Sequence, residues 1–212
     1  MIQFKKFVFN PFQENTYLVF DETREAVIID PGCYSQQEVE TIKQIVDSDK
    51  LRIKFLVNTH CHIDHILGIY SLKELFKVKS LAHEADRLLM QTATQQAMIF
   101  GLSLNGIPQS DENIYDGDKI HFGNSYLQVI HTPGHTPGCI SLYSPEHKIV
   151  FTGDTLFNQS IGRTDLAGGD YDTIINSIKN KLLILEEDIS IYPGHGDAST
   201  IGNEKKHNPF LN

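Results

Sequence analysis

The chain repeats one plan twice, and this repetition constrains its fold more than any other feature of the sequence. In the first half, the strand-like run 25–30 ends at Asp30, a helical pattern follows, and a second strand ends at His60. In the second half, a strand ends at Asp154, a helical pattern follows, and another strand ends at His195. We interpret the echo as an internal duplication. It predicts an α+β fold in which two sheets face each other with helices outside, a four-layer αβ/βα sandwich.

Periodicity and turn signals predict the other elements. Ser35 and Glu38 form a capping box ahead of apolar residues at helical spacing. Further helical patterns cover 66–76, 84–100 and 171–185. Strand-like runs cover 3–9, 15–20, 25–30, 53–57, 119–122, 126–130, 140–143, 149–151 and 189–192. We expect residues 1–212 to form a single domain with halves of roughly 1–116 and 117–212.

Composition narrows the class of protein. A hydrophobic content of 40% and a charged content of 21% are typical of a globular domain. The net charge of −9 argues against nucleic acid as the main partner. Three cysteines without paired spacing favour a reducing compartment, and no stretch reaches transmembrane length. We therefore expect a cytoplasmic protein with no membrane partner, and the sequence carries no signal for an oligomeric state.

The run from Thr59 to His65 carries three imidazoles and one carboxylate. Because side chains alternate along an extended segment, His60 and His62 point the same way and can bind one cation. Asp64 and His65 come just beyond, where the chain can turn towards a second cation. Imidazole and carboxylate are ligands of zinc, iron and manganese, and such sites usually keep an open position for catalysis. The run predicts a catalytic metal site rather than a polar loop.

Three further polar motifs follow strands or tight turns. Two Pro-Gly pairs flank His135, Gly153 precedes Asp154, and glycines precede and follow His195. Taken alone, each is also explained by an ordinary surface turn or helix cap.

Together with the run Thr59–His65, these motifs resemble the metallo-β-lactamase superfamily in order and along nearly the whole chain, and most closely its glyoxalase II-like hydrolases. The resemblance implies two metal ions: one held by His60, His62 and His135, the other by Asp64, His65 and His195, with Asp154 as the bridge. Lactam-cleaving members often have cysteine in place of Asp154 and are exported, so a β-lactamase is not expected.

Two segments narrow the resemblance. The run Gly162–Asp165 is similar to single-domain glyoxalase II-like proteins and also to persulfide dioxygenases. The segment from Ser199 to Leu211 looks like the ending of the single-domain hydrolases. Two-domain glyoxalase II enzymes continue with a helical segment that helps bind glutathione. This sequence stops at Asn212, which puts glutathione itself in doubt as the substrate.

The resemblance implies a binuclear metallohydrolase that cleaves a small-molecule thioester such as an S-acylglutathione. Two cations, zinc first and iron or manganese as alternatives, would lower the pKa of a bridging water and polarise the substrate carbonyl. Asp154 and Asp64 are the candidate catalytic residues, Asp64 also orienting the hydroxide. A mononuclear iron persulfide dioxygenase and a lactone or ester hydrolase remain as alternatives. A non-enzymatic metal-binding module predicts a degraded ligand set, whereas this set is complete.

Several residues keep two interpretations. Arg163 suits a substrate carboxylate, but an ion pair with Asp165 or Asp170 is favoured because the acids are so near. Asp30 fixes a histidine tautomer or simply occupies a turn. Residues 98–108 wall the substrate site or, as the safer interpretation, pack between helices. Cys61 alternates away from the histidine face and is expected to be an inert buried thiol. No role is assigned to His83, His121, His131, His147 or His207, of which His83 comes nearest to the predicted cleft.

Overall fold

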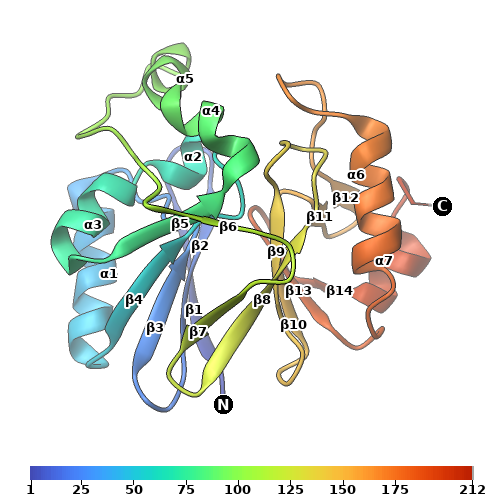
Figure 1. Cartoon of the computed structure of the whole chain (residues 1–212), viewed down its shortest axis with the longest axis horizontal. Helices are drawn as coiled ribbons and strands as arrows, with labels where there is room; N and C mark the ends of the chain where they lie inside the picture. The colour runs from blue at the N-terminus through green and yellow to red at the C-terminus, as the bar shows by residue number, and fades with distance from the viewer. Residues whose placement is uncertain (212) are drawn as a thin grey trace.

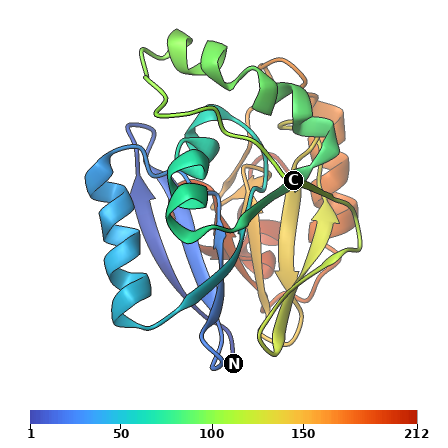
Figure 2. The same ribbon diagram turned by 60° about the vertical axis from the view of Figure 1, so that its left-hand side comes forward.

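Two six-stranded sheets face each other across the apolar interior of the protein (Figures 1 and 2). The computed structural model describes residues 1–211. The strands of the first sheet lie side by side in chain order: β1 (Gln3–Phe9), β2 (Glu14–Phe20), β3 (Glu25–Ile29), β4 (Arg52–Val57), β5 (Lys79–His83) and β6 (Glu112–Ile114). The pairings from β1 to β3 are antiparallel, and those from β3 to β6 are parallel.

The second sheet has the order β14-β13-β10-β9-β8-β7. Its strands are β7 (Lys119–Phe122), β8 (Ser125–His131), β9 (Ile140–Ser144), β10 (Ile149–Gly153), β13 (Ser190–Pro193) and β14 (Ser199–Thr200). Only β10 and β13 pair in parallel. A small hairpin of β11 (Leu156–Phe157) and β12 (Ser160–Ile161) follows β10.

Helices cover the outer face of each sheet, so the predicted four-layer sandwich is confirmed (Figure 1). The helices are α1 (Gln36–Ser48), α2 (Ile63–Ile66), α3 (Ile69–Phe76), α4 (Arg87–Gln91), α5 (Ala93–Ile99), α6 (Tyr171–Ser177) and α7 (Ile201–His207). In Figure 1, α1 and α3 lie outside the first sheet, α6 and α7 lie outside the second, and α4 and α5 lie at the top. The predicted capping box starts α1: Ser35 Oγ accepts from the N–H of Glu38 at 3.2 Å, and the Glu38 carboxylate accepts from the N–H of Ser35 at 2.8 Å.

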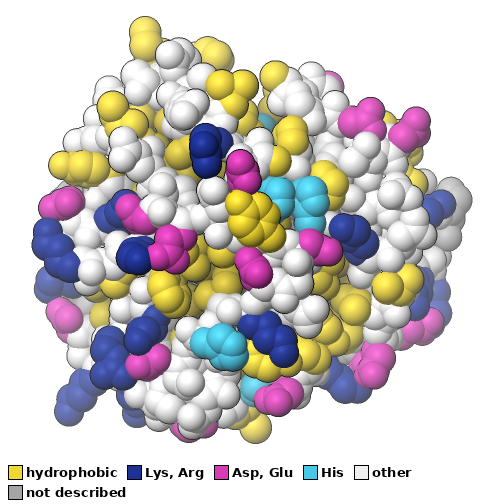
Figure 3. Space-filling model, in the orientation of Figure 1, with side chains coloured by type: hydrophobic (Ala, Val, Ile, Leu, Met, Phe, Trp, Pro, Cys, Tyr) yellow, Lys and Arg dark blue, Asp and Glu magenta, His cyan; other side chains and the backbone are white. Residues whose placement is uncertain are grey.

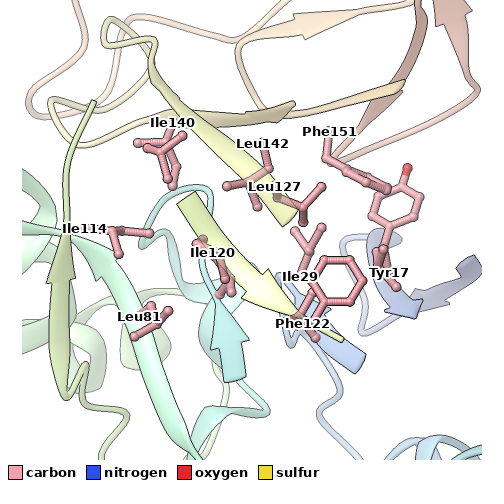
Figure 4. Close-up of a cluster of buried hydrophobic side chains, with 14 of the residues drawn as sticks. Tyr17, Ile29, Leu81, Ile114, Ile120, Phe122, Leu127, Ile140, Leu142 and Phe151 are labelled. Carbon is pink, nitrogen blue, oxygen red and sulfur yellow. The ribbon is translucent and has the colours of Figure 1, made fainter. Parts of the chain in front are cut away.

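The main apolar core lies between the sheets (Figure 4). Tyr17 and Ile29 of the first sheet meet Leu127, Leu142 and Phe151 of the second there. Two further clusters lie beneath the outer helices, one under α1 and one under α6 and α7. Because the main cluster contains side chains from both sheets, we propose that residues 1–212 form one domain.

The predicted echo corresponds to two parallel strand pairs, β3–β4 with α1 between them in the chain and β10–β13 with α6 between them. Parallel neighbours end at the same edge of a sheet, so the residues that follow β3, β4, β10 and β13 gather at one end of the sandwich. The candidate metal ligands lie at this end.

Three predicted helices are shorter or more divided than expected. The pattern 66–76 is broken at Gly68, where a side-chain carbon would lie only 2.3 Å from Cys33 Sγ. The pattern 84–100 is divided into a 3-10 turn (Glu84–Asp86), α4 and α5. The pattern 171–185 continues from α6 as the π turn Ile178–Leu182 and ends there.

Charged side chains of both signs are interspersed on the face shown in Figure 3, with apolar side chains between them. Within residues 1–211, no helix has the length and apolar character needed to cross a membrane.

Candidate metal centre

The first segment of candidate ligands connects β4 to α2. His60 and His62 lie in non-helical backbone after the strand, and His62 is extended where it precedes α2 (φ −66°, ψ 153°). Asp64 and His65 lie within that short helix. The side-chain amide of Asn58 donates to the carbonyl of His65 at 2.8 Å and so fixes the turn. The change from extended to helical backbone turns the chain between the two pairs of residues, as the sequence predicted.

Three loops of the second sheet supply the other candidates. His135 lies in the turn between β8 and β9, where the Gly134 N–H donates to the carbonyl of Thr136 at 3.0 Å. Asp154 follows β10 directly, and His195 comes two residues after β13. All three loops reach the end of the sandwich where the first segment lies.

His60, His62 and His135 form one group of imidazoles. One ring nitrogen from each lies within 4.8 Å of the others, and His62 Nδ1 is 2.8 Å from His135 Nε2. A tetrahedral zinc site with Zn–N bonds of about 2.0–2.1 Å places neighbouring ligand nitrogens about 3.3 Å apart. The spacing of this group therefore suits one shared cation.

Asp64, His65 and His195 form a second group, and Asp154 lies between the two. His195 Nε2 is 3.1 Å from Asp64 Oδ2 and 3.3 Å from His65 Nε2. Asp154 Oδ1 lies 3.5 Å from His65 Nε2, whereas Asp154 Oδ2 lies 3.7 Å from His135 Nε2. Asp154 Oδ2 also lies 3.6 Å from His195 Nε2. Oδ1 therefore faces the second group, whereas Oδ2 lies between the two groups.

Two buried polar atoms support the fit to cations. His60 Nε2 and Asp154 Oδ1 have no hydrogen-bond partner in the described part of the chain. A buried polar atom left unpaired costs about 1–3 kcal/mol, so a site with two of them favours an occupant that accepts their lone pairs. Divalent cations of the zinc, iron and manganese kind do so with nitrogen and oxygen donors.

The second group attracts positive charge. Burial opposes a charge on His65, but the carboxylates of Asp64, Asp154 and Asp30 outweigh it and hold the pKa of His65 well above its ordinary value. The pKa of His195 is likewise raised, because the hydrogen bond with Asp64 and the charge of Asp154 overcome the effect of burial. A cation bound here would displace protons from these imidazoles, since ligand histidines are neutral.

The first group has the opposite electrostatic character. Burial, followed by the neighbouring imidazoles, lowers the pKa of His60 well below its ordinary value. Burial and His135 lower the pKa of His62 to about 3. These two rings are therefore neutral at pH 7, which is the form that binds a metal.

Polar contacts on the far side of two imidazoles orient their rings. Asp30 Oδ2 lies 3.2 Å from His65 Nδ1 and also accepts from the Thr59 hydroxyl at 2.6 Å, while Asp30 Oδ1 accepts from the Thr59 N–H at 2.7 Å. His135 Nδ1 lies 2.7 Å from the carbonyl oxygen of Arg163, which can only accept. Each contact leaves the Nε2 atom facing the candidate site.

The side chain of Arg163 forms the ion pair that the sequence favoured. Its Nε and Nη2 atoms each lie 2.7 Å from an oxygen of Asp165, and the side chain is 60% exposed. Asp170 instead caps α6 by accepting from the N–H of Thr173. The main chain of Arg163, rather than its side chain, contacts the candidate ligand His135.

Sequence reasoning missed Glu14, a fully buried carboxyl beside Asp30 and His65. Burial raises the pKa of Glu14 well above its ordinary value, and its Oε1 has no partner in the described structure. The signal available in the sequence was the polar stretch 10–15 between two strand-like runs, and the structure has left-handed backbone there at Asn10 and Gln13. A tight turn of this kind places polar side chains at the end of a sheet.

The remaining histidines lie apart from both groups. His83 and His131 stack on each other with ring centroids 4.2 Å apart, away from the seven candidate ligands. The others have local partners: Tyr126 beside His121, Ser144 with His147 and Asn203 with His207. Cys61 is buried and free, and burial raises the pKa of its thiol well above the ordinary value.

The segment 98–108 was expected either to wall the substrate site or to pack between helices, and neither interpretation describes all of it. Leu102 and Leu104 pack against a buried cluster, as expected for structural packing. Met98, Ile99 and Phe100 are instead more than half exposed. Phe100 packs edge-to-face against Phe12 of the β1–β2 turn, with the ring centroids 5.1 Å apart. Interhelical packing therefore does not explain the exposed half of the segment.

Comparisons with known proteins agree with this arrangement. The family described as the metallo-beta-lactamase superfamily matches residues 9–195. The hydroxyacylglutathione hydrolase GloC of Haemophilus influenzae is 40% identical over 208 residues, which cover 95% of this chain and 94% of the relative. The mitochondrial persulfide dioxygenase ETHE1 of Bos taurus is 37% identical over 202 residues, which cover 92% of this chain and 70% of the relative.

Two solved structures share the whole fold. The B3 metallo-beta-lactamase BLEG-1 has a TM-score of 0.90 at 34% identity, with 99% of each chain covered. The protein TTHA1623 in a di-iron-bound form has a TM-score of 0.88 at 35% identity, with 98% of this chain and 100% of that chain covered.

Proposed function

The chain belongs to the metallo-beta-lactamase superfamily and is an enzyme of its metallohydrolase class, and on this premise we propose that it cleaves small-molecule thioesters such as S-acylglutathiones with two bound divalent cations. The observation that carries the proposal is the position of Asp154 between the two histidine groups: its carboxylate lies 3.5 Å from His65, 3.6 Å from His195 and 3.7 Å from His135. A single carboxylate so placed suits a bridge between two ions. The 40% identity to the GloC hydrolase supports the thioester substrate.

The residues divide into three roles. His60, His62 and His135 would hold one cation, and Asp64, His65 and His195 would hold the other, with Asp154 shared. When bound, the ions supply two effects: they lower the pKa of a water molecule towards neutrality and they attract the charge that develops on the substrate carbonyl. Asp64 and Asp154 provide the negative charge that gathers the cations.

The hydrolysis itself requires little further from the protein. Water adds to the carbonyl carbon, the C–S bond breaks, and the products are a carboxylic acid and a thiol. With a parent thiol pKa of about 8.5, the thiolate leaves without a strong general acid. The chain's own residues therefore act mainly by orientation: Asp30 sets the His65 ring, and the Arg163 carbonyl sets the His135 ring.

Zinc is the first expectation for the metal because binding affinity favours it over iron and manganese. The di-iron form of TTHA1623 makes iron a specific alternative. Metal analysis of protein purified from cells with a balanced metal supply distinguishes the two, and two ions per chain are expected in either case.

The test is hydrolysis of S-D-lactoylglutathione by protein of measured metal content, with Asp154→Ala as the control. We expect a kcat/KM of about 10⁴ M⁻¹s⁻¹ or more, lost in the variant together with at least one metal ion. If the protein binds two metal ions but lacks this activity, it is still a metallohydrolase, but glutathione thioesters are excluded as its substrates. Other thioesters, lactones and, because of the BLEG-1 likeness, β-lactams would then be assayed.

A second candidate function is oxidation of a persulfide by a mononuclear iron centre, which the 37% identity to the ETHE1 dioxygenase supports. It predicts one iron per chain and oxygen consumption with glutathione persulfide. The complete second group, Asp64, His65 and His195, favours the binuclear hydrolase instead. One iron per chain with persulfide-dependent oxygen uptake would replace our proposal with this one.

A further inference from the structure

Asp86 is a buried carboxylate outside both groups of candidate ligands, and its contacts connect two of the ligand segments. It ends the 3-10 turn that follows β5 and is 1% exposed. Its oxygens accept three hydrogen bonds: Oδ2 from the Cys61 N–H at 2.9 Å and from the Thr136 hydroxyl at 2.8 Å, and Oδ1 from the Gly138 N–H at 2.7 Å.

The donors of these hydrogen bonds lie in the two segments that carry His60, His62 and His135. The Cys61 N–H belongs to the residue between His60 and His62. Thr136 directly follows His135 in the turn between β8 and β9. Asp86 therefore holds the main chain beside the two histidines of the first half and the turn that carries the histidine of the second half.

The glycine at position 138 is independent support for a built contact. A side-chain carbon there would lie 2.6 Å from both Cγ and Oδ1 of Asp86 and 2.7 Å from its main-chain nitrogen. Contacts under 3.0 Å are essentially never made by real side chains, so only glycine lets the Asp86 carboxylate approach so closely.

We propose that Asp86 is a positioning residue for the metal subsite formed by His60, His62 and His135. It sets the separation of the two ligand segments from behind, without contacting the cation or the substrate. His62 Nδ1 and His135 Nε2 lie 2.8 Å apart, and they can reach one cation only while the main chains of their two segments keep this separation. A carboxylate with three short hydrogen bonds provides that constraint, since charge-assisted hydrogen bonds are the strong ones.

The inference rests on the proposed metal site, and its test is metal affinity rather than turnover. In Asp86→Asn, one oxygen becomes an amide N–H₂, which donates and so opposes a backbone N–H from either Cys61 or Gly138. Alanine is less informative, because Asp86 lines a cavity of about 520 Å³ that water would fill. Stepwise zinc affinities are measured by competition with a chromophoric chelator, and the cobalt-substituted protein reports ligand geometry through its visible spectrum.

The matched control is Glu204→Gln. Glu204 is as buried as Asp86 and its carboxylate also accepts several hydrogen bonds, from the Gln159 N–H at 2.8 Å and from Asn203 and Asn208 at 2.8 Å. These bonds connect α7 to the turn between β11 and β12, and none of their donors lies next to a candidate ligand. Both variants should lose thermal stability, but only Asp86→Asn should lower the affinity for one of the two zinc ions.

In Asp86→Asn, we expect the affinity for one zinc ion to fall by about 10- to 100-fold and the cobalt spectrum to change. In Glu204→Gln, we expect both zinc affinities to change by less than about threefold. Gly138→Ala, which displaces the same carboxylate, should reproduce the loss, and it carries the test if Asp86→Asn does not fold. Two ions bound as tightly in Asp86→Asn as in the wild type would overturn this inference alone. A wild-type protein that binds no zinc, iron or manganese would overturn it together with the proposed function.

Discussion

Gly194 lies against the metal centre, and replacing it with alanine is our sharpest test of the site. A side-chain carbon at this position would lie 2.2 Å from Asp154 Oδ1 and 2.7 Å from His65 Cε1. Both neighbours are candidate ligands. The methyl group of Gly194→Ala therefore pushes on the proposed bridge and on one histidine of the second group at once.

The magnitude follows from the overlap. A carbon and an oxygen in ordinary contact are separated by more than 3 Å, so Asp154 must retreat by about 1 Å. A displacement of about 1 Å at a catalytic centre costs about 100-fold in rate, or about 2.7 kcal/mol of transition-state free energy. Overpacking in a rigid interior also costs about 1–3 kcal/mol of folding free energy.

Gly196→Ala, two residues along the same loop, is the matched control. Among residues 1–211, nothing lies within 4 Å of a side-chain carbon at Gly196, but its φ of +74° strains any other residue. The strain costs roughly 1–2 kcal/mol, so the two variants should lose comparable stability in thermal unfolding. Bound metal per chain and kcat/KM for S-D-lactoylglutathione should fall only in Gly194→Ala. If Gly194→Ala keeps both ions and activity within about threefold of the wild type, the close approach of Gly194 does not limit the centre and our reasoning fails.

Three further predictions concern groups outside the ligand set. All three cysteines should react with a thiol reagent such as dithiobis(nitrobenzoate) only after denaturation, because burial raises the pKa of each thiol; rapid labelling of the native protein would contradict this. Arg163→Ala should leave the thermal unfolding midpoint nearly unchanged, since its ion pair with Asp165 is exposed, and should leave KM unaltered; a large rise in KM would instead assign the side chain to the substrate. Ser35→Ala should lower the free energy of unfolding by about 1 kcal/mol in urea titration through loss of the cap on α1, and an unchanged midpoint would show that the cap is not needed.

Much of the site could be predicted because its signals are local. The alternation that places His60 and His62 on one side needs only three residues of extended chain, and the turn at Asp64 and His65 follows within three more. The capping box at Ser35 is local in the same way. Such patterns depend on backbone geometry that neighbouring residues determine, so the sequence alone carries them.

The role that we propose for Asp86 could not be predicted, because it depends on partners far away in the chain. Its three donors lie 25, 50 and 52 residues from it. No periodicity connects such positions, and an aspartate ahead of an apolar run reads as an ordinary helix start. The division of the predicted helix 84–100 has a related cause. Its first residues form the 3-10 turn that directs Asp86 towards the ligand segments, and α4 begins only after that turn.

Shorter elements were missed for a different reason. β6, β11, β12 and β14 have two or three residues each. Segments of this length show no measurable alternation, and they form because a neighbouring strand is already in place.

The distances along the chain within the metal centre also set an order of events during folding. His62 and His135 are 73 residues apart, and His65 and His195 are 130 residues apart. Contacts between such distant segments form late, because closing the intervening loops costs entropy before any contact compensates for it. During synthesis, the proposed first metal site would be complete only after His135 has emerged from the ribosome, and the proposed second site only after His195. Metal uptake is therefore expected to report that nearly the whole chain has been made and folded, and a nascent chain that ends before His195 should retain at most one ion.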